Sequence, residues 1–598
     1  MNSHSSDRAS MPRADRPIAI IGLACRFPGA RNTDELWELL CGGVDATRSV
    51  PPSRFDADEL YERSPASPGK VASRRCGLVA DADKFDAEFF GISLIEARRL
   101  DPQQRLLLMA AWEAFEDAGQ PPEHYRGSQT GVFIGQMNSD YWDLQLRRDP
   151  ADLTLYSFTG SHQRSMTAGR LSFTFDLRGP SVVVDTACSS SLMAVHQACQ
   201  SVRSGESAMA VAGGVNLVLT ANANIMYSQA RMLAPDGHCK FADARADGLV
   251  RSDGVAVVIL KTLDQALEDG DPIRAIIRGG AAGNDGGDRP HIAAPSLNGH
   301  MHTLASAYQA SGIRPADVDY LEAHGTGTRI DLIELTAFAE VLGKGRPADR
   351  PLLVGSVKTN IGHAEAAAGM AGLIKTVLCL EHGQVPPNLH YETPHPKFDW
   401  ENAPLVVPTR MYELPSQERP WIAGVNSQGV SSTNVHLVLA QAQRDELRDP
   451  DVGRPHLLAL SARTENALND LITSYLVYLA PEGPGRTHSL RDICFTAGPR
   501  RAHHEVRLAV VGATHDEILA ALRGRRDPLG PRVSSTDGPD DGTGLRRLME
   551  RASQGYEATG AAAWEQLCEP FARCVPIPGY PWQLARFRLE DEPEGTHG

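Results

Sequence analysis

VVVDTACSSSLMAVH, residues 182–196, is the most informative stretch of this chain. A short run of β-branched residues, typical of a strand, leads into Cys188, and the residues from Ser190 onward read as the start of a helix. A cysteine at a strand-to-helix turn lies near unpaired backbone N–H groups and the positive end of the helix dipole, which favour a thiolate. The stretch therefore predicts a nucleophile.

Two histidines lie in other loops that are rich in small residues. His324 lies in EAHGTGT, residues 322–328, and His363 lies in KTNIGHAEAAAG, residues 358–369. One cysteine and two histidines of this kind suit nucleophilic acyl chemistry. Taken singly, each also has an ordinary interpretation, because a cysteine is usually a small buried apolar residue and a histidine beside glycine usually belongs to a loop. HGTGT lacks the Lys-Ser/Thr ending of a phosphate-binding P-loop.

The order and the residues of these motifs resemble those of the β-ketoacyl synthase (ketosynthase) domains of modular polyketide synthases. The same resemblance is carried by IAIIGLACRFPGA at 18–30, FFGIS at 89–93, LDPQQRLLL at 100–108, AGRLSF at 168–173 and RMLAPDG at 231–237. It covers residues 17–440 and implies a thiolase-like α/β fold of two similar halves, layered α-β-α-β-α.

Composition and charge narrow the class of protein. The 598 residues, 42% hydrophobic and 22% charged, are typical of two or three globular domains. The formal net charge of −15 argues against nucleic acid or an anionic membrane as a partner. No signal peptide or membrane-spanning stretch is evident, so we expect a cytoplasmic protein. Ten cysteines without metal-binding spacing predict reduced thiols and no metal site.

Apolar segments alternate with helical patterns over the first 440 residues, which predicts an α/β architecture. Strands are expected at 18–21, 132–134, 182–184, 208–211 and 255–259, and then at 273–277, 320–323, 352–354, 422–425 and 435–439. We assign 1–16 to a disordered tail, 17–265 to the half with the nucleophile and 266–440 to the half with the histidine motifs.

Past residue 440 the composition changes. Residues 453–525 resemble the small α/β linker domain between ketosynthase and acyltransferase domains, and 526–560 are expected to form a flexible connector. Residues 561–590 resemble the segment that follows an acyltransferase and packs back on the ketosynthase. No Gly-x-Ser-x-Gly elbow or carrier-protein serine motif occurs. We therefore expect a standalone ketosynthase, a homodimer, working with an acyl or peptidyl carrier protein in trans.

The resemblance also implies catalytic roles. Cys188 would hold the acyl chain as a thioester, and its N–H would form an oxyanion hole with a backbone N–H near Val430. His324 and His363 would polarise the malonyl thioester, support loss of CO₂ and stabilise the enolate. Lys358 would orient or charge the histidine pair through Glu365.

The substrate contacts implied are Thr326, Thr328, Asn360, Gln428 and Val430. Thr326 and Thr328 would hydrogen-bond the phosphopantetheine arm of the carrier. The resemblance requires no metal and no tightly bound cofactor.

Two segments depart from the family pattern. After HGTGT the family usually reads x-Leu-Gly-Asp-Pro-Ile-Glu, whereas residues 329–334 read RIDLIE, one residue shorter and without Gly or Pro. We therefore expect a rebuilt loop beside His324. In the second segment, Gln428 replaces the phenylalanine that gates the pocket and Ser432 replaces a flexible glycine.

Two enzymatic hypotheses stay open on these grounds. One is decarboxylative Claisen elongation of a polyketide chain, favoured by retention of Lys358 and both histidines. The other is a non-elongating enzyme that cyclises a tethered chain by an internal aldol-type step and releases it, for example as a lactone. The altered gate and the missing acyltransferase and carrier favour the second. A catalytically silent scaffold is disfavoured, because such partners normally lose the cysteine.

Overall fold

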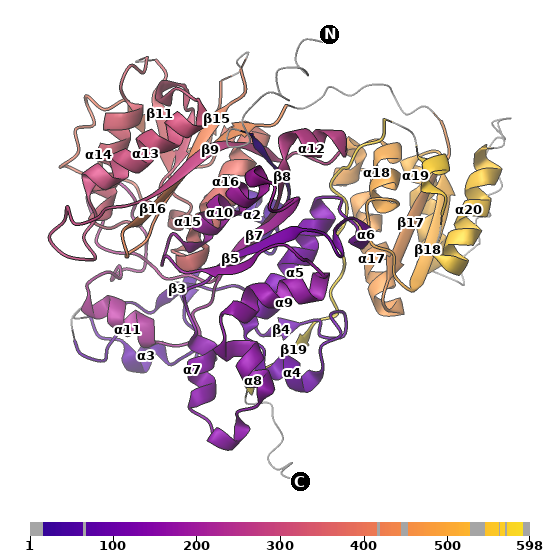
Figure 1. The fold of residues 1–598 in the computed structure, drawn as a ribbon, viewed down its shortest axis with the longest axis horizontal. Helices are drawn as coiled ribbons and strands as arrows, with labels where there is room; N and C mark the ends of the chain where they lie inside the picture. Colours follow the sequence, from indigo (N-terminus) through magenta and orange to yellow (C-terminus); the bar gives the residue numbers. More distant parts are fainter. Residues whose placement is uncertain are drawn as a thin grey trace.

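The computed structural model describes residues 16–63, 67–347, 349–415, 419–443, 453–526, 545–560, 562–568 and 571–589. A large α/β body is formed by the first 440 residues, and a smaller α/β domain, orange to yellow, lies beside it (Figure 1). Of the predicted tail, 1–16, all but Arg16 lies outside the described residues. Among the helices so described, none is long and apolar enough to cross a membrane.

One eleven-stranded sheet runs through the body, and its two halves repeat the same pairing pattern. The first half contains, in spatial order, β1 (Ile18–Arg26), β8 (Gly254–Thr262), β7 (Met209–Asn216), β5 (Thr130–Gly135) and β6 (Ser181–Val184). The second contains β9 (Ala275–Asn284), β16 (Thr433–Gln441), β15 (Ile422–Gln428), β10 (Tyr320–Glu322), β11 (Leu352–Gly355) and β13 (Leu405–Val406). In each half the first three strands are antiparallel and the later ones are parallel. The halves are joined where β1 pairs with β9.

Two helices lie between the halves. α10 (Ser190–Ser204) packs on β7 and β5, α16 (Ala368–His382) packs on β15 and β10, and the two helices contact each other. α16 is buried all round except at its C-terminal end, as expected for a helix at the centre of a large core, whereas α10 also has exposed residues such as Gln197 and Gln200. α5 (Pro102–Asp117) and α9 (Ser165–Phe175) cover the outer face of the first half, and α13 (Leu297–Ser311) and α14 (Ile330–Leu342) belong to the second. These layers confirm the predicted thiolase-like fold.

The remaining elements of the body are short. They are α2 (Thr33–Cys41), β2 (Thr47–Ser49), α3 (Ala57–Leu60), β3 (Arg75–Gly77), β4 (Lys84–Phe85), α4 (Leu94–Arg99), α6 (Pro122–Tyr125), α7 (Asp140–Leu146), η2 (Pro150–Asp152), α8 (Leu155–Ser157), η3 (Phe158–His162), α11 (Asn222–Gln229), α12 (Leu263–Glu268), η4 (Pro315–Asp317), α15 (Lys358–Ile361), η5 (Glu365–Ala367), β12 (Gln384–Val385) and β14 (Tyr412–Glu413).

The smaller domain is built on a two-stranded antiparallel sheet of β17 (His456–Ala462) and β18 (Val506–Gly512). Its helices are α17 (Glu465–Tyr478), η6 (Pro484–Thr487), α18 (Leu490–Ala497), α19 (His515–Arg526), α20 (Leu545–Thr559) and α21 (Trp564–Leu567). α20 lies within the segment predicted as a flexible connector, 526–560, so that prediction is wrong for its second part. Met549, Ala552 and Tyr556 recur at helical spacing and pack against the sheet. Residues 527–544 lie outside the described residues.

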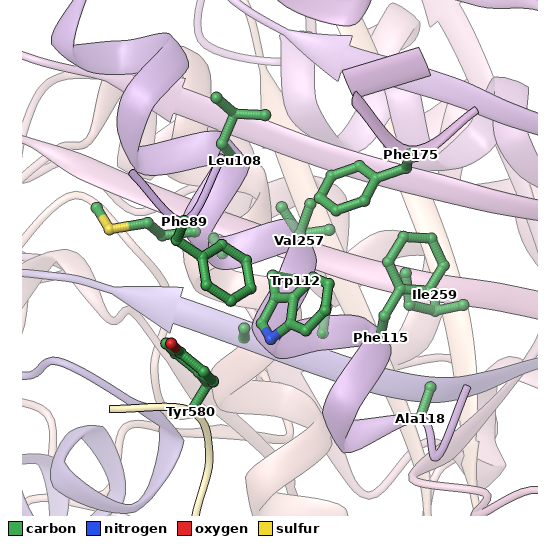
Figure 2. Close-up of a cluster of buried hydrophobic side chains, with 14 of the residues drawn as sticks. Phe89, Leu108, Trp112, Phe115, Ala118, Phe175, Val257, Ile259 and Tyr580 are labelled. Carbon is green, nitrogen blue, oxygen red and sulfur yellow. The ribbon is translucent and has the colours of Figure 1, made fainter. Parts of the chain in front are cut away.

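The C-terminal segment, 571–589, runs from the smaller domain back over the body. Its strand β19 (Ala585–Arg586) pairs antiparallel with β4. Tyr580 packs against Phe89, with ring centroids 4.5 Å apart, and Trp112 lies next to Phe89 in the same buried cluster (Figure 2). Arg105 donates a hydrogen bond of 2.9 Å to the carbonyl of Phe587. These contacts make the segment part of the core of the body.

Candidate active site

Cys188 lies in a tight turn between β6 and α10. The Ser189 hydroxyl donates to the Thr186 carbonyl at 2.9 Å, and the Thr186 N–H donates to Ser190 Oγ at 2.9 Å. Ala187 has a φ of +57°, a conformation that costs an L-residue about 1–2 kcal/mol. The serines of the motif therefore hold a strained turn that presents the partly exposed Cys188.

The segment after β15 packs directly on this turn. A Cβ on Gly429 would lie 2.1 Å from the Thr186 carbonyl oxygen, so only glycine fits there. The Ser427 hydroxyl donates to the Cys188 carbonyl at 3.2 Å. As a result the backbone N–H of Val430 and that of Cys188 both contact the Cys188 sulfur. Two N–H groups converging on a nucleophile form a suitable oxyanion hole.

The groups around the Cys188 thiol act on its pKa in opposite directions. Burial raises its pKa to about 12, and the charge of Glu365 adds to this. Lys358 and the two N–H groups lower the pKa, but they do not outweigh burial. Burial of the turn by the segment after β15 therefore opposes the thiolate that the sequence predicts, and the thiolate stays a prediction.

We expect alkylation of Cys188 by iodoacetamide to accelerate about tenfold per pH unit between about pH 7 and pH 9, because the thiolate fraction rises in proportion well below the pKa. Intact-protein mass after timed exposure measures the rate, with Cys188→Ser to subtract alkylation elsewhere. A rate that levels off within this range would show that the thiol pKa is low.

His324 and His363 are held as neutral hydrogen-bond donors. Nδ1 of His324 accepts the Gln428 N–H at 3.4 Å, and Nδ1 of His363 accepts the Glu365 N–H at 3.0 Å. An imidazole that accepts at Nδ1 carries its proton on Nε2. The rings meet edge to face, with centroids 5.4 Å apart. Burial and the charge of Lys358 hold the pKa of both histidines well below the usual range, so both are neutral at neutral pH.

Two buried carboxylates hold the loop that carries His324. Glu334 accepts the N–H groups of His324 and Gly325 at 2.6 and 2.9 Å, and Asp331 accepts those of Thr326 and Gly327 at 3.1 Å. Both acids belong to α14, which begins directly at Ile330. Burial, with a contribution from Glu334, raises the pKa of Asp331 to about 7. The shortened segment 329–334 is thus secured without the Gly and Pro of the family pattern.

Lys358 contacts His324 directly, and Glu365 does not link them. Its ammonium donates to the His324 carbonyl at 2.5 Å. Glu365 instead forms a fully buried ion pair with Arg251, at 2.5 and 3.1 Å, and accepts a hydrogen bond from Asn138. The predicted Lys358–Glu365 link is therefore wrong. Arg251 was missed, because nothing in the sequence marks it as the partner of a residue 114 positions away.

The expected substrate contacts differ in their surroundings. The hydroxyls of Thr326 and Thr328 lie 2.9 Å apart, and Val430 is exposed. Asn360 is fully buried, and its side chain donates to the Val44 carbonyl at 3.1 Å. In the structure this side chain fastens the loop after α2, and its contact with substrate stays a prediction.

Gln428 places a polar group where the sequence predicted an altered gate. Its side-chain nitrogen lies 3.0 Å from Nδ1 of His300 on α13, and both side chains are buried. Its Oε1 is buried, and no described residue hydrogen-bonds to it. A buried amide oxygen without a partner is costly unless a ligand or water satisfies it.

Comparison with known proteins agrees with this geometry. The profiles "Beta-ketoacyl synthase, N-terminal domain", "Beta-ketoacyl synthase, C-terminal domain" and "CurL-like, PKS C-terminal" match residues 15–266, 274–392 and 456–522. Over 521 residues the chain is 43% identical to one of the phenolphthiocerol/phthiocerol polyketide synthase proteins of Mycobacterium tuberculosis, covering 86% of this chain and 28% of that protein. Over 549 residues it is 43% identical to the spectinabilin polyketide synthase system protein NorC of Streptomyces orinoci, covering 88% and 24%. The chain thus spans less than a third of the length of these relatives.

Two solved structures are similar along the whole chain. One is the ketosynthase from module 6 of the bacillaene synthase of Bacillus subtilis 168, with a TM-score of 0.86, 31% identity and coverage of 96% of this chain and 100% of that one. The other is the oxazolomycin ketosynthase domain OzmH KS7 of Streptomyces albus JA3453, with a TM-score of 0.87, 32% identity and coverage of 96% and 99%.

Proposed function

The chain belongs to the β-ketoacyl synthase family, whose members form carbon–carbon bonds by acyl transfer, and from this premise we propose that it carries out decarboxylative condensation of a polyketide chain on Cys188. The acyl chain and the malonyl-type extender both arrive as thioesters on the phosphopantetheine of carrier proteins. The hydroxyls of Thr326 and Thr328 bind this arm. The ten free cysteines suit a reducing cytoplasm.

In the loading step, the Cys188 sulfur attacks the acyl thioester and the bond from the acyl carbon to the carrier sulfur breaks. The tetrahedral oxyanion accepts hydrogen bonds from the N–H groups of Cys188 and Val430. The proton lost from the Cys188 thiol leaves on the carrier thiol, so no net proton is gained or lost.

In the condensing step, the bond between the malonyl α-carbon and its carboxylate breaks and CO₂ leaves. The electron pair forms an enolate, whose oxygen accepts hydrogen bonds from Nε2–H of His324 and His363. The α-carbon then attacks the acyl carbonyl on Cys188, and the cysteine leaves as a thiolate that takes up one proton. The product is a β-ketoacyl thioester on the carrier.

One observation carries this proposal above cyclisation. Both histidines are neutral and fixed with the proton on Nε2 by backbone N–H groups at Nδ1. Such a pair donates to a developing enolate oxygen but lacks a free basic nitrogen. An internal aldol-type step needs a base to remove a proton from carbon, whereas decarboxylation produces the enolate without one.

The test combines the protein with an acyl pantetheine thioester and a malonyl-loaded carrier, followed by mass spectrometry. We expect growth by one two-carbon unit and one CO₂ per turnover. Release of an unextended isomer of the acyl chain, without any need for the malonyl carrier, would contradict the proposal and support cyclisation.

We also propose a homodimer formed through the open edge of the sheet. β6 is the last strand, its Val182 is 38% exposed, and Phe173 on the neighbouring α9 is 86% exposed. Unpaired strand edges beside exposed aromatic residues are common places for a second copy to pair. We expect light scattering to give twice the chain mass at micromolar concentration and Phe173→Glu to shift the protein toward monomer. A stable monomer of the unaltered protein would contradict this prediction.

For the acyl substrate we propose a polar group, such as an amide or hydroxyl, that satisfies Oε1 of Gln428. Replacement Gln428→Phe is expected to lower kcat/KM for such chains about tenfold or more, the cost of a lost buried hydrogen bond, while plain saturated chains are tolerated. Its backbone N–H still donates to His324, so the histidine stays in place. Gln428→Met, similar in length but without the amide, is the matched control and should show the same preference. If the unaltered protein prefers saturated chains, the prediction is wrong.

A further inference from the structure

A second cluster of ionisable side chains lies outside the residues assigned to catalysis. Asp45 comes from the loop between α2 and β2, His238 from the loop between α11 and β8, and His390 from the loop after β12. One ligand atom of each lies within 4.8 Å of the others, and all three side chains are partly exposed. No metal site was expected from the sequence, because these residues lie far apart in the chain and form no local spacing.

The donor atoms face one another. Nδ1 of His238 lies 2.8 Å and Nε2 of His390 lies 3.3 Å from the same oxygen, Oδ2 of Asp45. With metal–ligand bonds of about 2.1 Å, these separations correspond to angles at a central ion of about 85° and 105°. The first angle is close to that of an octahedral site and the second to that of a tetrahedral site.

The rest of the cluster leaves these atoms available. The other oxygen of Asp45, Oδ1, accepts the Thr47 N–H and hydroxyl at 2.9 and 2.7 Å, which fixes the carboxylate with Oδ2 toward the imidazoles. Nε2 of His390 is buried, and no described group forms a well-aligned hydrogen bond with it. His390 also has a φ of +59°, so its side chain is held here by a strained backbone.

We propose that Asp45, His238 and His390 bind one divalent transition-metal ion, for which Zn²⁺ is suited. Two imidazoles and one carboxylate are a common set of three protein ligands for zinc, and solvent reaches the cluster to complete the coordination with water. A ring nitrogen that binds the ion cannot carry a proton, so protons compete with the ion and binding weakens in acid.

One neighbouring cation opposes the ion. The guanidinium of Arg75 lies 3.5 Å from Oδ2 of Asp45, while it also donates to the Thr47 carbonyl at 2.7 Å. The Thr47 contact gives Arg75 a second anchor when the metal takes over Oδ2. Because two cations then share one carboxylate, the site binds zinc less tightly than a closed structural site with four protein ligands.

The ion would join segments that support Lys358. The residues beside Asp45, Val44 and Ala46, both hydrogen-bond to Asn360 of α15, and the residue before His390, Leu389, donates to Thr359 of the same helix. α15 begins with Lys358. An ion at the cluster therefore fixes two loops on either side of this helix, and it stabilises the folded protein by mass action.

The full chain, freed of metal with a chelator, would be titrated with ZnCl₂ by calorimetry and with CoCl₂ by absorption spectroscopy. We expect one ion per chain, a rise in melting temperature, and a cobalt spectrum of nitrogen and oxygen ligands. Asp45→Asn, His238→Ala and His390→Ala are each expected to lose at least about tenfold in affinity. His302→Ala, which removes an exposed histidine on α13, is the matched control and should bind normally.

Melting temperatures and circular dichroism without metal check that each variant is folded. Three results would overturn the proposal: equal binding by the control and the cluster variants, no binding by the unaltered protein, or a thiolate-to-cobalt absorption band, which would place the ion on a cysteine. The readouts are independent of condensing activity, so failure here leaves the proposed function untouched.

Discussion

Replacement Cys188→Ala is expected to abolish acyl loading and to leave the fold intact. Removal of a catalytic nucleophile costs on the order of 10⁶ in rate where it has been measured. The fold should persist because the turn is held by the hydroxyls of Ser189 and Ser190 and by backbone groups of Thr186 and Ala187, not by the sulfur. Intact mass after incubation with an acyl pantetheine thioester reads the loading directly.

The matched control is Cys199→Ala, on the same helix α10. Cys199 is buried in the core, so its loss should lower stability somewhat without changing the acyl adduct. One acyl group per chain on the Cys188→Ala protein would show that the nucleophile lies elsewhere.

Replacements His324→Ala and His363→Ala are expected to permit loading of Cys188 but to slow the carbon–carbon step by about 10²–10⁴, the usual contribution of a positioned proton donor. Each variant also leaves a buried backbone N–H, of Gln428 or Glu365, without its acceptor, which costs about 1–3 kcal/mol. Loading is read by mass, and decarboxylation of the malonyl carrier by CO₂ release.

Replacement by asparagine separates the loss of the proton donor from the loss of stability. In His324→Asn and His363→Asn the side-chain oxygen replaces Nδ1 as the acceptor, while the Nε2–H donor is lost. These variants should match the alanine proteins in rate and the unaltered protein in stability. Normal CO₂ release from both asparagine variants would remove the histidines from the mechanism.

The strands were predictable because each is caused locally, by a run of β-branched and aliphatic residues. All ten expected strands belong to the central sheet, whereas β13, only two residues long, has too little sequence to form a pattern. α20 was missed because the flexible connector, predicted from the Gly- and Pro-rich residues up to Gly544, was assumed to continue to residue 560. Its own residues, Met549, Ala552 and Tyr556, carry a regular helical spacing.

The site was predictable where it depends on adjacent residues and not where it depends on distant side chains. The turn at Cys188 and the N–H group of Val430 follow from short motifs. The partner of Glu365 is Arg251, which leads into β8, and Asn360 fastens a loop 316 positions earlier. A motif indicates that polar residues such as Glu365 and Asn360 are needed, but only the fold shows which groups they contact.

The pairing of β1 with β9 has a mechanical consequence. It makes the sheet continuous from one half to the other, while α10 and α16 fill the space between the halves. The halves therefore cannot separate as rigid bodies without breaking the sheet and opening the core. Entry and exit of substrate must depend on small rearrangements of the loops around the site, such as the turn after Gln428, within a rigid frame.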